Sequence, residues 1–393
     1  MRQGWEIKRL SDICDKITDG SHNPPKGGPH SSYLMISSQN VFNDKIALDA
    51  VRYLEEDDFI REDKRTSVRK GDVLLTIVGT VGRCAVFSED VNITLQRSVA
   101  VLRPQATLTS RFLMYTLIGK NKELNAEAHG IAQKGIYLRQ LSQLCMSVPP
   151  LSEQERIVAE LDCLSSVIEK QKEQLKELDN LAQSIFYAMF GNPLTNSMGW
   201  NTKKIGDVCI VNPSKKETSK TLNATDIISF LPMEDLPIKA CYHSPKQHRL
   251  LSEVQSSYTC FAENDVLMAK VTPCFENGKI GIATELQNGV GYGSSEFIVI
   301  RANQADVLKE YIYFVVQDPT FIDRATAQLT GTSGLRRVPR TFVESCVISI
   351  PPLALQQEFA SKIEAIEKQK ELIKQSIAET ETLFNSRMDY YFN

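Results

Sequence analysis

Two long stretches of the chain carry apolar residues at alternating intervals of three and four positions. In the first they are Ile157, Leu161, Leu164, Ile168, Leu175, Leu178, Ala182, Ile185 and Met189, and in the second Phe359, Ile363, Ile366, Ile373, Ile377 and Phe384. This spacing is typical of a coiled-coil seam. The polar residues Gln171, Lys370 and Thr380 interrupt the two seams.

Helix-capping and helix-breaking residues define the length of the first helix. A Pro-Pro pair at 149–150 precedes it, Ser152 with Glu155 fits a capping box, and Gly191 with Pro193 provides the stop. We expect two helices of about 40 residues, each about 60 Å long. Neither helix would be stable alone in water with its row of apolar side chains exposed, so the two helices should pair with each other. An antiparallel pairing would return the C-terminal end to the N-terminal module.

The two stretches close the copies of a repeat with a period of about 200 residues. The matching segments are Gly4-Trp5 with Gly199-Trp200, Asp12 to Cys14 with Asp207 to Cys209, Gly71 to Leu74 with Asn264 to Leu267, Pro149 to Leu151 with Pro351 to Leu353, and Ile168 to Glu173 with Ile366 to Glu371. Solenoid repeats have periods of only about 20–50 residues. The sequence therefore predicts two homologous globular modules in tandem.

Each module has the pattern of a compact α/β (α+β) fold. We predict strands at Val73–Val78 and Phe297–Ile300, helices at Arg111–Gly119 and Lys309–Val316, and loops at Gly20–Ser32 and Gly289–Ser295. The first long helix lies between the two modules, and the second long helix follows the second module.

Composition is that of an ordinary globular chain, with 42% hydrophobic and 24% charged residues. The N-terminal segment lacks a signal-peptide core, and no apolar run reaches the about 18 residues of a membrane span. The nine cysteines form no CxxC pair and their number is odd, which argues against a disulfide framework. Cys14 and Cys209 occupy equivalent places and should be buried. We expect a cytoplasmic protein that does not enter a membrane.

The net charge of −3 is unevenly distributed along the chain. Residues 1–150 hold 20 Lys and Arg against 17 Asp and Glu, whereas residues 151–198 hold 4 against 8. Residues 199–352 balance at 16 against 16, and residues 353–393 hold 5 against 7. The acidity therefore belongs to the helical segments, and the modules can carry a basic face.

No motif supports catalysis, a metal site or a cofactor site. The Asn-Pro-Pro at 23–25 is like the substrate loop of amino-methyltransferases, but Lys26 replaces the aromatic residue and no Gly-rich cofactor turn precedes it. There is no Walker A sequence and no HExxH, and no PD precedes the ExK of Glu62 and Lys64.

Polar loops recur at equivalent places in the two copies. One pair is residues 79–83 and 271–279, and the other is residues 129–137 and 330–337. Both pairs place glycines beside Lys or Arg, which suits contact with phosphates, and Gln, Ser, Thr and Arg, which suit contact with base edges.

The whole chain resembles the specificity (S) subunit of type I restriction–modification systems. The resemblance rests on Pro-Pro-Leu-x-x-Gln at 149–154 and 351–356, on Gly4-Trp5 with Asp12, on the GDVLL strand at 71–75 and on the Gly-x-x-Gly-Arg turn at 79–83. Copy two departs from the pattern at Asn264, Leu355 and Thr272-Pro273.

The resemblance implies four parts: target-recognition domains at 1–150 and 193–352, and conserved helices at 151–192 and 353–393. Each domain would read one half of a bipartite site in double-stranded DNA, and the helices would set the spacer. The helices would also dock methyltransferase (M) subunits, two for each chain, while restriction (R) subunits join through the complex. S-adenosylmethionine and ATP would bind those partners, with no cofactor in this chain.

The predicted DNA-binding residues lie in the polar loops of both copies. They are Ser21, His22, Lys26, Thr80, Arg83, Gln133, Lys134, Tyr137, Lys215, Lys216, Thr272, Lys279, Ser294, Thr332, Ser333, Arg336 and Arg337. Three alternatives stay open: the S subunit of a related type II system, a coiled-coil scaffold without a DNA role, and a standalone methyltransferase. The scaffold would not need duplicated polar loops, and the methyltransferase lacks its cofactor loop.

Overall fold

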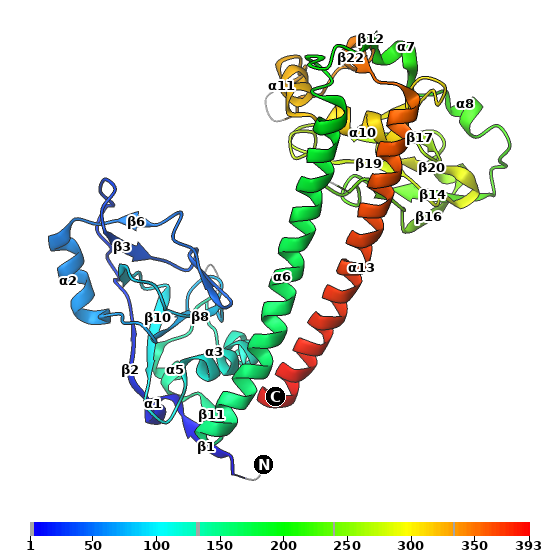
Figure 1. Cartoon of the computed structure of the whole chain (residues 1–393). Helices are drawn as coiled ribbons and strands as arrows, with labels where there is room; N and C mark the ends of the chain where they lie inside the picture. Colours follow the sequence, from blue (N-terminus) through cyan, green and yellow to red (C-terminus); the bar gives the residue numbers. More distant parts are fainter. Residues whose placement is uncertain (1–3, 131–133, 239, 333–334) are drawn as a thin grey trace. The chain divides into compact units, whose positions relative to one another are not determined.

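The computed structural model describes residues 4–130, 134–238, 240–332 and 335–393. The chain divides into two compact units (Figure 1). Unit 1 comprises Met1–Lys170 with Ile377–Asn393, and unit 2 comprises Gln171–Ser376. Each unit therefore contains one copy of the repeat and one end of each long helix.

Unit 1 is built around a four-stranded antiparallel sheet of order β2-β10-β7-β8. A second sheet has the order β6-β3-β9 with β3 and β9 parallel, and β1 pairs with β11 and β4 with β5. The strands are β1 (Glu6–Arg9), β2 (Cys14–Asp19), β3 (Tyr33–Ile36), β4 (Val41–Phe42), β5 (Lys45–Ile46), β6 (Arg52–Tyr53), β7 (Val73–Thr76), β8 (Cys84–Val86), β9 (Asn92–Leu95), β10 (Val99–Pro104) and β11 (Cys145–Val148). The short helices are α1 (Leu10–Ile13), α2 (Glu56–Thr66), α3 (Ser110–Gly119), α4 (Asn121–Ala126) and α5 (Leu138–Gln143).

Unit 2 has a five-stranded sheet of order β13-β21-β18-β19-β15 and a four-stranded sheet of order β16-β14-β20-β17, and β12 pairs with β22. The strands are β12 (Asn201–Lys204), β13 (Cys209–Val211), β14 (Ile227–Leu231), β15 (Tyr242–His243), β16 (Gln247–Leu250), β17 (Thr259–Ala262), β18 (Val266–Ala269), β19 (Ile280–Ala283), β20 (Val290–Gly293), β21 (Phe297–Ala302) and β22 (Val347–Ile350). The short helices are α7 (Ile205–Val208), α8 (Lys215–Thr218), α9 (Leu251–Val254), the 3-10 helix η1 (Gln287–Gly289), α10 (Lys309–Gln317), α11 (Pro319–Ala327) and α12 (Arg340–Ser345).

The pairing order of unit 1 recurs in unit 2, which confirms two homologous modules. The strands β13-β21-β18-β19 correspond to β2-β10-β7-β8, and the parallel pair β14–β20 corresponds to β3–β9. The predicted strands and short helices are present as β7, β21, α3 and α10.

The repeated Asp-Val-Leu sequence has the same structural role in both units. Val73 and Leu75 face one core cluster while Leu74 faces another, so the strand is apolar on both sides. Asp72 accepts two hydrogen bonds of 2.8 and 2.7 Å from the Arg103 guanidinium of the neighbouring strand. Asp265 and Arg301 repeat this pair at the same two distances. Because both carboxylates are only 1% exposed, each needs its arginine partner.

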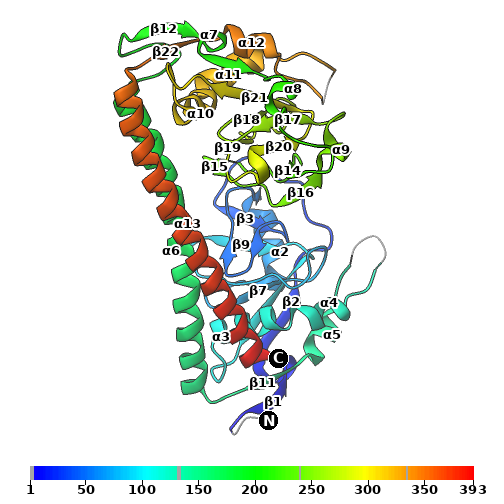
Figure 2. The ribbon, with the colours of Figure 1, turned by 90° about the vertical axis from the view of Figure 1, so that its right-hand side faces the viewer.

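The two predicted long helices are present as α6 (Leu151–Phe190) and α13 (Leu353–Phe392), each of 40 residues (Figure 2). In unit 1, Glu160 of α6 accepts from the Tyr391 hydroxyl and pairs with Arg387, both at 2.7 Å. In unit 2, Gln171 donates to the Ser376 hydroxyl at 2.7 Å. Within unit 2 the partner numbers on α13 fall as those on α6 rise, from Gln171 with Ser376 to Asp179 with Lys370, both at 2.7 Å, so the two helices run antiparallel there.

The C-terminal end of α13 packs near the start of the chain, as predicted. The Phe392 ring lies 5.5 Å from that of Phe112, and the Phe112 ring lies 6.4 Å from that of Trp5. All these residues belong to unit 1.

Two predictions about local structure are wrong. The predicted capping box fails because α6 begins at Leu151 and Ser152 lies inside the helix. Hydrogen bonds of the Gln154 side chain hold the first turn of α6 instead. The side chain accepts from the Thr109 amide and donates to the Thr107 and Pro149 carbonyls, each at 2.9 Å. Gln356 repeats this arrangement with the Leu308 amide and the Asp306 and Pro351 carbonyls.

The second error concerns the segment Gly289–Ser295, which was predicted as a loop. The structure places the buried strand β20 there. Its glycines reflect close packing, because a Cβ at Gly291 would overlap the Phe261 ring and one at Gly293 would overlap the Leu231 carbonyl.

Candidate nucleic-acid interface

Three loops of unit 1 are joined where β7 ends and β10 begins, and we call residues 76–83, 96–98, 129–130 and 134–137 loop platform 1. The Ile77 amide donates to the Ser98 carbonyl and the Ile136 amide to the Ile77 carbonyl, both at 2.9 Å. The Gly79 amide donates to the Lys134 carbonyl at 2.9 Å. The ends of three polar loops therefore form one surface, as their positions after strands suggested.

Unit 2 has the same connections in residues 269–279, 294–296, 330–332 and 335–338, which we call loop platform 2. The Lys270 amide donates to the Glu296 carbonyl at 2.8 Å, and the Val338 amide donates to the Lys270 carbonyl at 2.9 Å. The Thr272 amide donates to the Arg336 carbonyl at 2.9 Å. Each bond has its counterpart in loop platform 1, so the two loop pairs recognised in the sequence are structurally equivalent.

The matched hydrogen bonds make Lys134 and Arg336 equivalent residues. Both side chains are exposed. The Arg336 guanidinium has one distant carboxylate partner, Glu276, at 3.8 Å. Lys134 makes no ion pair with any residue that the structure describes. These two cations are available to a ligand on the surface.

Arg83 and Lys279 are a second equivalent pair, but their charges face the protein. Each carbonyl accepts from the neighbouring strand, from the Thr76 and Ala269 amides. The Arg83 guanidinium lies 5.2 Å from the centroid of the Phe42 ring. The Lys279 ammonium donates to the Met233 and Glu234 carbonyls at 2.8 and 3.1 Å. Their prediction as DNA contacts is untested, and their present contacts stabilise the loops.

Other predicted residues of unit 2 also hold the platform together. Thr272 is only 8% exposed, and its hydroxyl accepts from the Arg336 amide at 3.2 Å. Arg337 forms a bidentate pair with Glu296 at 2.8 to 3.2 Å, and this hydrogen bonding lowers the pKa of the Glu296 carboxyl below its usual value. The Ser294 hydroxyl accepts from the Glu296 amide. Thr332 is exposed.

Two adjoining depressions lie beside loop platform 1, with volumes of about 440 and 430 Å³. Ser21 lines the first, Tyr137 lines the second, and His22 lines both. The His22 imidazole lies 3.0 Å from the Asp19 carboxylate, which also pairs with Arg65. The Tyr137 side chain is 70% exposed, so its ring is accessible for stacking.

Sequence reasoning missed Arg97, which lines both depressions. Arg97 is exposed, and its guanidinium has no ion-pair partner among the described residues. It stands in the turn between β9 and β10, beside Gln96, which is equivalent to the predicted Ser294 of unit 2. A comparison of residues 96–98 with residues 294–296 in the sequence would have identified Arg97 as a candidate.

The remaining predicted residues divide into three groups. Lys26 and Thr80 are exposed on loops of unit 1. Lys215 and Lys216 are exposed on α8, where the Lys215 ammonium lies 3.3 and 3.4 Å from the Gln255 and Ser256 carbonyls. Gln133 and Ser333 lie outside the described residues.

Neither a metal cluster nor a membrane span is found in the part of the chain that the structure describes. No group of three or more His, Cys, Asp and Glu side chains is placed to hold an ion. No described helix is both long and apolar enough to cross a bilayer. All nine cysteines are unpaired, and Cys14 and Cys209 are buried as predicted.

The duplicated modules, with their loop platforms and terminal helices, agree with a known family. The model of the type I restriction modification DNA specificity domain matches residues 2–180 and 198–382. The chain therefore belongs to this family, and it contains two copies of the domain.

Similar proteins include the specificity subunits of two type I restriction enzymes of Escherichia coli. The chain is 32% identical over 154 residues to that of EcoEI and 34% identical over 159 residues to that of EcoAI. These matches cover 39% and 40% of this chain but only 25% and 26% of the two relatives. The putative MjaX specificity subunit of Methanocaldococcus jannaschii is 20% identical, with 95% of this chain and 91% of the relative covered.

Two solved structures share the fold. The S subunit of a type I restriction-modification system from M. genitalium has a TM-score of 0.56 at 11% identity, covering 99% of this chain and 96% of that one. A chain from a study of the assembly and conformational transition of the type I R-M system has a TM-score of 0.55 at 16% identity, covering 100% and 98%. At these identities the likeness concerns the fold alone.

Proposed function

We propose that the chain is the DNA-recognition subunit of a type I restriction–modification complex. Each unit reads one half of a bipartite target through its loop platform. The observation that carries this proposal is the duplicated platform, in which the same backbone hydrogen bonds present Lys134 in unit 1 and Arg336 in unit 2. Membership of the specificity-domain family supports the same function.

Phosphate contact is the role that fits these two cations best. Each is exposed on loops whose backbones are joined to one another by hydrogen bonds. A cation on a braced loop meets the DNA backbone with little loss of conformational freedom. Tyr137, His22 and Arg97 around the depressions of unit 1 supply a ring and polar groups for bases.

We further propose that the chain is not itself an enzyme and acts with methyltransferase subunits, two for each chain, and with restriction subunits. S-adenosylmethionine and ATP would bind those partners. The two long helices would set the distance between half-sites and dock the methyltransferase subunits. Apolar side chains that remain exposed on these helices, such as Leu181 and Leu372, support a docking role.

The test uses the equivalence of the two copies. Residues 199–352 are replaced by a second copy of residues 4–150, so that both modules are the first one. The purified chain is reconstituted with its methyltransferase partner, and methylated adenines are mapped on a genomic DNA library. We expect the variant to recognise the first half-site twice, in inverted orientation, because the two modules are joined by antiparallel helices.

The native chain reconstituted in parallel is the control, and it should methylate an asymmetric bipartite sequence. The chain alone with labelled S-adenosylmethionine and DNA should transfer no methyl group. An unchanged recognition sequence in the duplicated variant, or methyl transfer without a partner, would contradict the proposal. A type II assembly would show the same methylation without ATP-dependent cleavage.

A further inference from the structure

A cavity of about 370 Å³ lies in unit 2, between the C-terminal part of α6 (residues 179–187), residues 367–370 of α13 and the helices α10 and α11 (Figure 1). We call it the helical cavity. All of its lining residues belong to unit 2, and none of them belongs to loop platform 2. It is therefore separate from the candidate nucleic-acid interface. Its volume falls within the range of about 300–1,000 Å³ that is usual for small-molecule sites.

Aromatic rings form one part of the wall of this cavity. Its aromatic lining residues are Phe186 and Tyr187 of α6 and Tyr313 and Phe314 of α10. The Phe186 and Phe314 rings are stacked with centroids 5.3 Å apart, and the Tyr313 and Phe314 rings meet edge-on at 5.4 Å. Phe186 and Tyr313 are only 1% and 3% exposed, so the core of unit 2 holds their rings in place. The faces of such rings attract organic cations.

Charged side chains form another part of the wall, and carboxylates outnumber ammonium groups there. The Lys370 ammonium lies 2.7 Å from Oδ1 of Asp179 and 2.7 Å from Oε1 of Glu367. Asp318, which is only 2% exposed, accepts from the Tyr187 hydroxyl at 2.8 Å. Three carboxylates against one ammonium leave the lining residues with a net charge of −2. The helical cavity therefore favours a cation over an anion.

Two carboxylate oxygens of this group are left for an occupant. The ion pairs of Lys370 use one oxygen of Asp179 and one of Glu367. No residue that the structure describes donates a hydrogen bond to the second oxygen of either carboxylate, Oδ2 of Asp179 or Oε2 of Glu367. An ammonium provides three donors, and a carboxylate oxygen accepts them readily. A second ammonium at these oxygens would balance the charge that Lys370 leaves uncompensated.

The amide group of Gln317, on α10, also lines the helical cavity. Its Nε2 atom is enclosed by protein and makes no hydrogen bond with any described residue. Because buried polar groups nearly always have a partner, an enclosed amide in the wall of a cavity points to a partner inside that cavity. Turning the amide by 180° places its oxygen at the same position, so the group can accept from an ammonium as well as donate.

Two neighbouring acids experience the same negative surroundings. Burial is the largest cause that raises the pKa of the Cys241 thiol and of the Tyr313 hydroxyl, and the charge of Glu367 raises both pKa values further. Both groups line the helical cavity. Surroundings that oppose the formation of these anions stabilise a cation in the same place.

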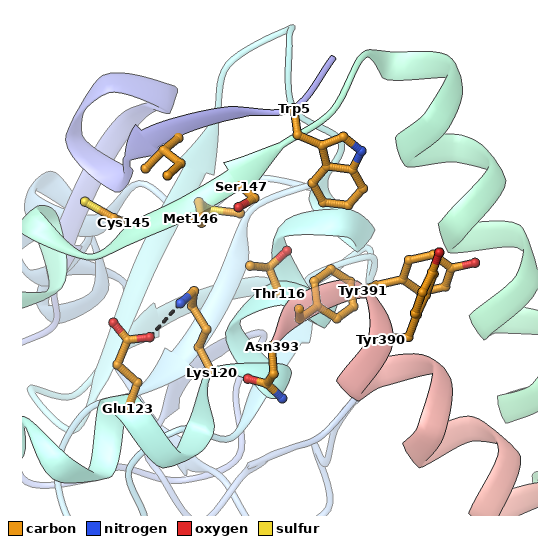
Figure 3. Close-up of a pocket in the computed structure, with 12 residues that line it drawn as sticks. Trp5, Thr116, Lys120, Glu123, Cys145, Met146, Ser147, Tyr390, Tyr391 and Asn393 are labelled. Atoms are coloured by element: carbon orange, nitrogen blue, oxygen red, sulfur yellow. Dashed lines mark hydrogen bonds and ion pairs between the residues drawn. The ribbon is translucent and has the colours of Figure 1, made fainter. Parts of the chain in front are cut away.

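The cavity at the end of α13 in unit 1 differs in its charge (Figure 3). Lys120 and Glu123 are the charged side chains among its described lining residues, and their ion pair measures 2.6 Å. One ammonium and one carboxylate leave no excess of negative charge. A cation should therefore bind once per chain, in unit 2.

We propose that the helical cavity binds a small organic cation, a primary ammonium on a short aliphatic chain. The ammonium lies beside Asp179 and Glu367. The aliphatic chain lies against the rings of Phe314 and Tyr187, and the Gln317 amide forms a hydrogen bond with the occupant. The site uses no residue of either loop platform, so the inference does not depend on the proposed recognition of DNA.

Isothermal titration calorimetry on the full chain tests this site, with pentylammonium chloride as the probe and without DNA. We expect one saturable site with a dissociation constant of about 0.1–1 mM, which is within the limit for so small a molecule. An ionic strength of about 0.15 M screens weak attraction to exposed carboxylates of the helices. Pentan-1-ol and pentanoate carry a similar chain without the positive charge, and both should bind at least about tenfold more weakly.

Variants test the contacts one at a time. Glu367→Gln removes one carboxylate and should weaken pentylammonium binding by about tenfold, as expected for the loss of one charge-assisted hydrogen bond. Gln317→Leu keeps a similar shape and should weaken binding by about three- to tenfold. Glu177→Gln is the matched control, because Glu177 is exposed on α6 and does not line the cavity, and it should leave binding unchanged. If Glu367→Gln does not fold, Gln317→Leu and the two probes without a positive charge test the same site.

Three results would overturn the inference. They are heat that does not saturate up to about 10 mM pentylammonium, equal binding of pentan-1-ol, and equal weakening by Glu177→Gln and Glu367→Gln. Nα-acetyl-lysine N-methylamide carries the same ammonium on an amino acid side chain. Tighter binding of this compound than of pentylammonium would contradict a free amine and assign the site to a lysine of a partner protein. None of these measurements involves DNA or methyl transfer, so their failure leaves the proposed function untouched.

Discussion

At the scale of single residues, the two equivalent pairs of cations in the loop platforms have different surroundings. Lys134 and Arg336 are exposed, whereas Arg83 lies over the Phe42 ring and Lys279 donates to two carbonyls. Because all four residues are cations, their distance from internal partners is the basis for proposing Lys134 and Arg336, and not Arg83 and Lys279, as phosphate contacts.

We predict that Lys134→Ala and Arg336→Ala each weaken DNA binding by the reconstituted complex on every sequence. Each should lower the slope of log affinity against log salt by about one, as expected for one lost phosphate contact. The measurement is fluorescence anisotropy across a salt series. Arg83→Ala and Lys279→Ala are the matched controls. They should lower the free energy of unfolding and leave the slope of log affinity against log salt nearly unchanged. Equal slopes for all four variants would contradict this division.

At the scale of elements, the start of each long helix depends on one buried glutamine. We predict that Gln356→Leu lowers the free energy of unfolding by about 2–4 kcal/mol, because buried groups left unpaired cost about 1–3 kcal/mol each. Those groups are the Leu308 amide and the Asp306 and Pro351 carbonyls. Urea unfolding measures the change, and Gln357→Leu, at the exposed neighbouring position, is the control.

The seam between the helices contains the buried Lys370, whose ammonium lies 2.7 Å from both Asp179 and Glu367. Burial lowers the pKa of this group, but the hydrogen bonds that it donates to the two carboxylates outweigh this effect, so the pKa is raised overall. A raised pKa in the folded state stabilises the protein fully below the unfolded pKa of about 10.4, and this contribution is lost as pH rises through the folded pKa.

We therefore predict that Lys370→Ile is destabilising at pH 7, by less than the about 3–5 kcal/mol typical of a broken buried pair. The cost is reduced because Asp179 remains 40% exposed to solvent. Relative to the native chain, the variant should regain stability only above about pH 10.4, as pH rises through the raised folded pKa of Lys370. Thermal unfolding across this range measures the change, and the exposed Lys374→Ile is the control. A difference that does not change with pH would refute the assignment.

At the scale of the whole molecule, the end of α13 and the start of β1 meet in unit 1. We predict that a circular permutant folds when Asn393 is joined to Gly4 through a copy of residues 192–198. New ends can be opened at the exposed loop between Glu89 and Asp90. Its melting temperature should stay within about 5 °C of the native one. A seven-residue Gly-Ser linker is the control and should give the less stable product.

The proposed spacer function predicts the outcome of matched insertions. Four residues inserted after Lys170 and after Ser376 lengthen each helix by about 6 Å. The methylated sequence should keep both half-sites and gain unread bases between them. An insertion in only one helix, as control, should disrupt the pairing and lower activity. If the matched insertions changed the bases that are read, the helices would not set the spacer.

The sequence by itself determined the repeat, both long helices and the strands β7 and β21. These features follow from the spacing of apolar residues and from the repeated segments. The spacing of apolar residues indicates which face of a helix or strand is buried, and it can be read from the local sequence alone. The same analysis found the loop pairs of both platforms, because the two copies could be compared position by position. The glycine-rich segment of β20 was misread, because close packing against Phe261 is a contact between segments distant in the sequence.

Only the tertiary structure decided which polar side chains are used internally. Gln154 and Gln356 belong to a recognisable motif, but their partners precede them by 45 and 48 residues. Likewise, the exposure of Lys134 and the engagement of Lys279 depend on loops brought together by the sheet. Such differences arise from contacts across the fold, which no local pattern contains.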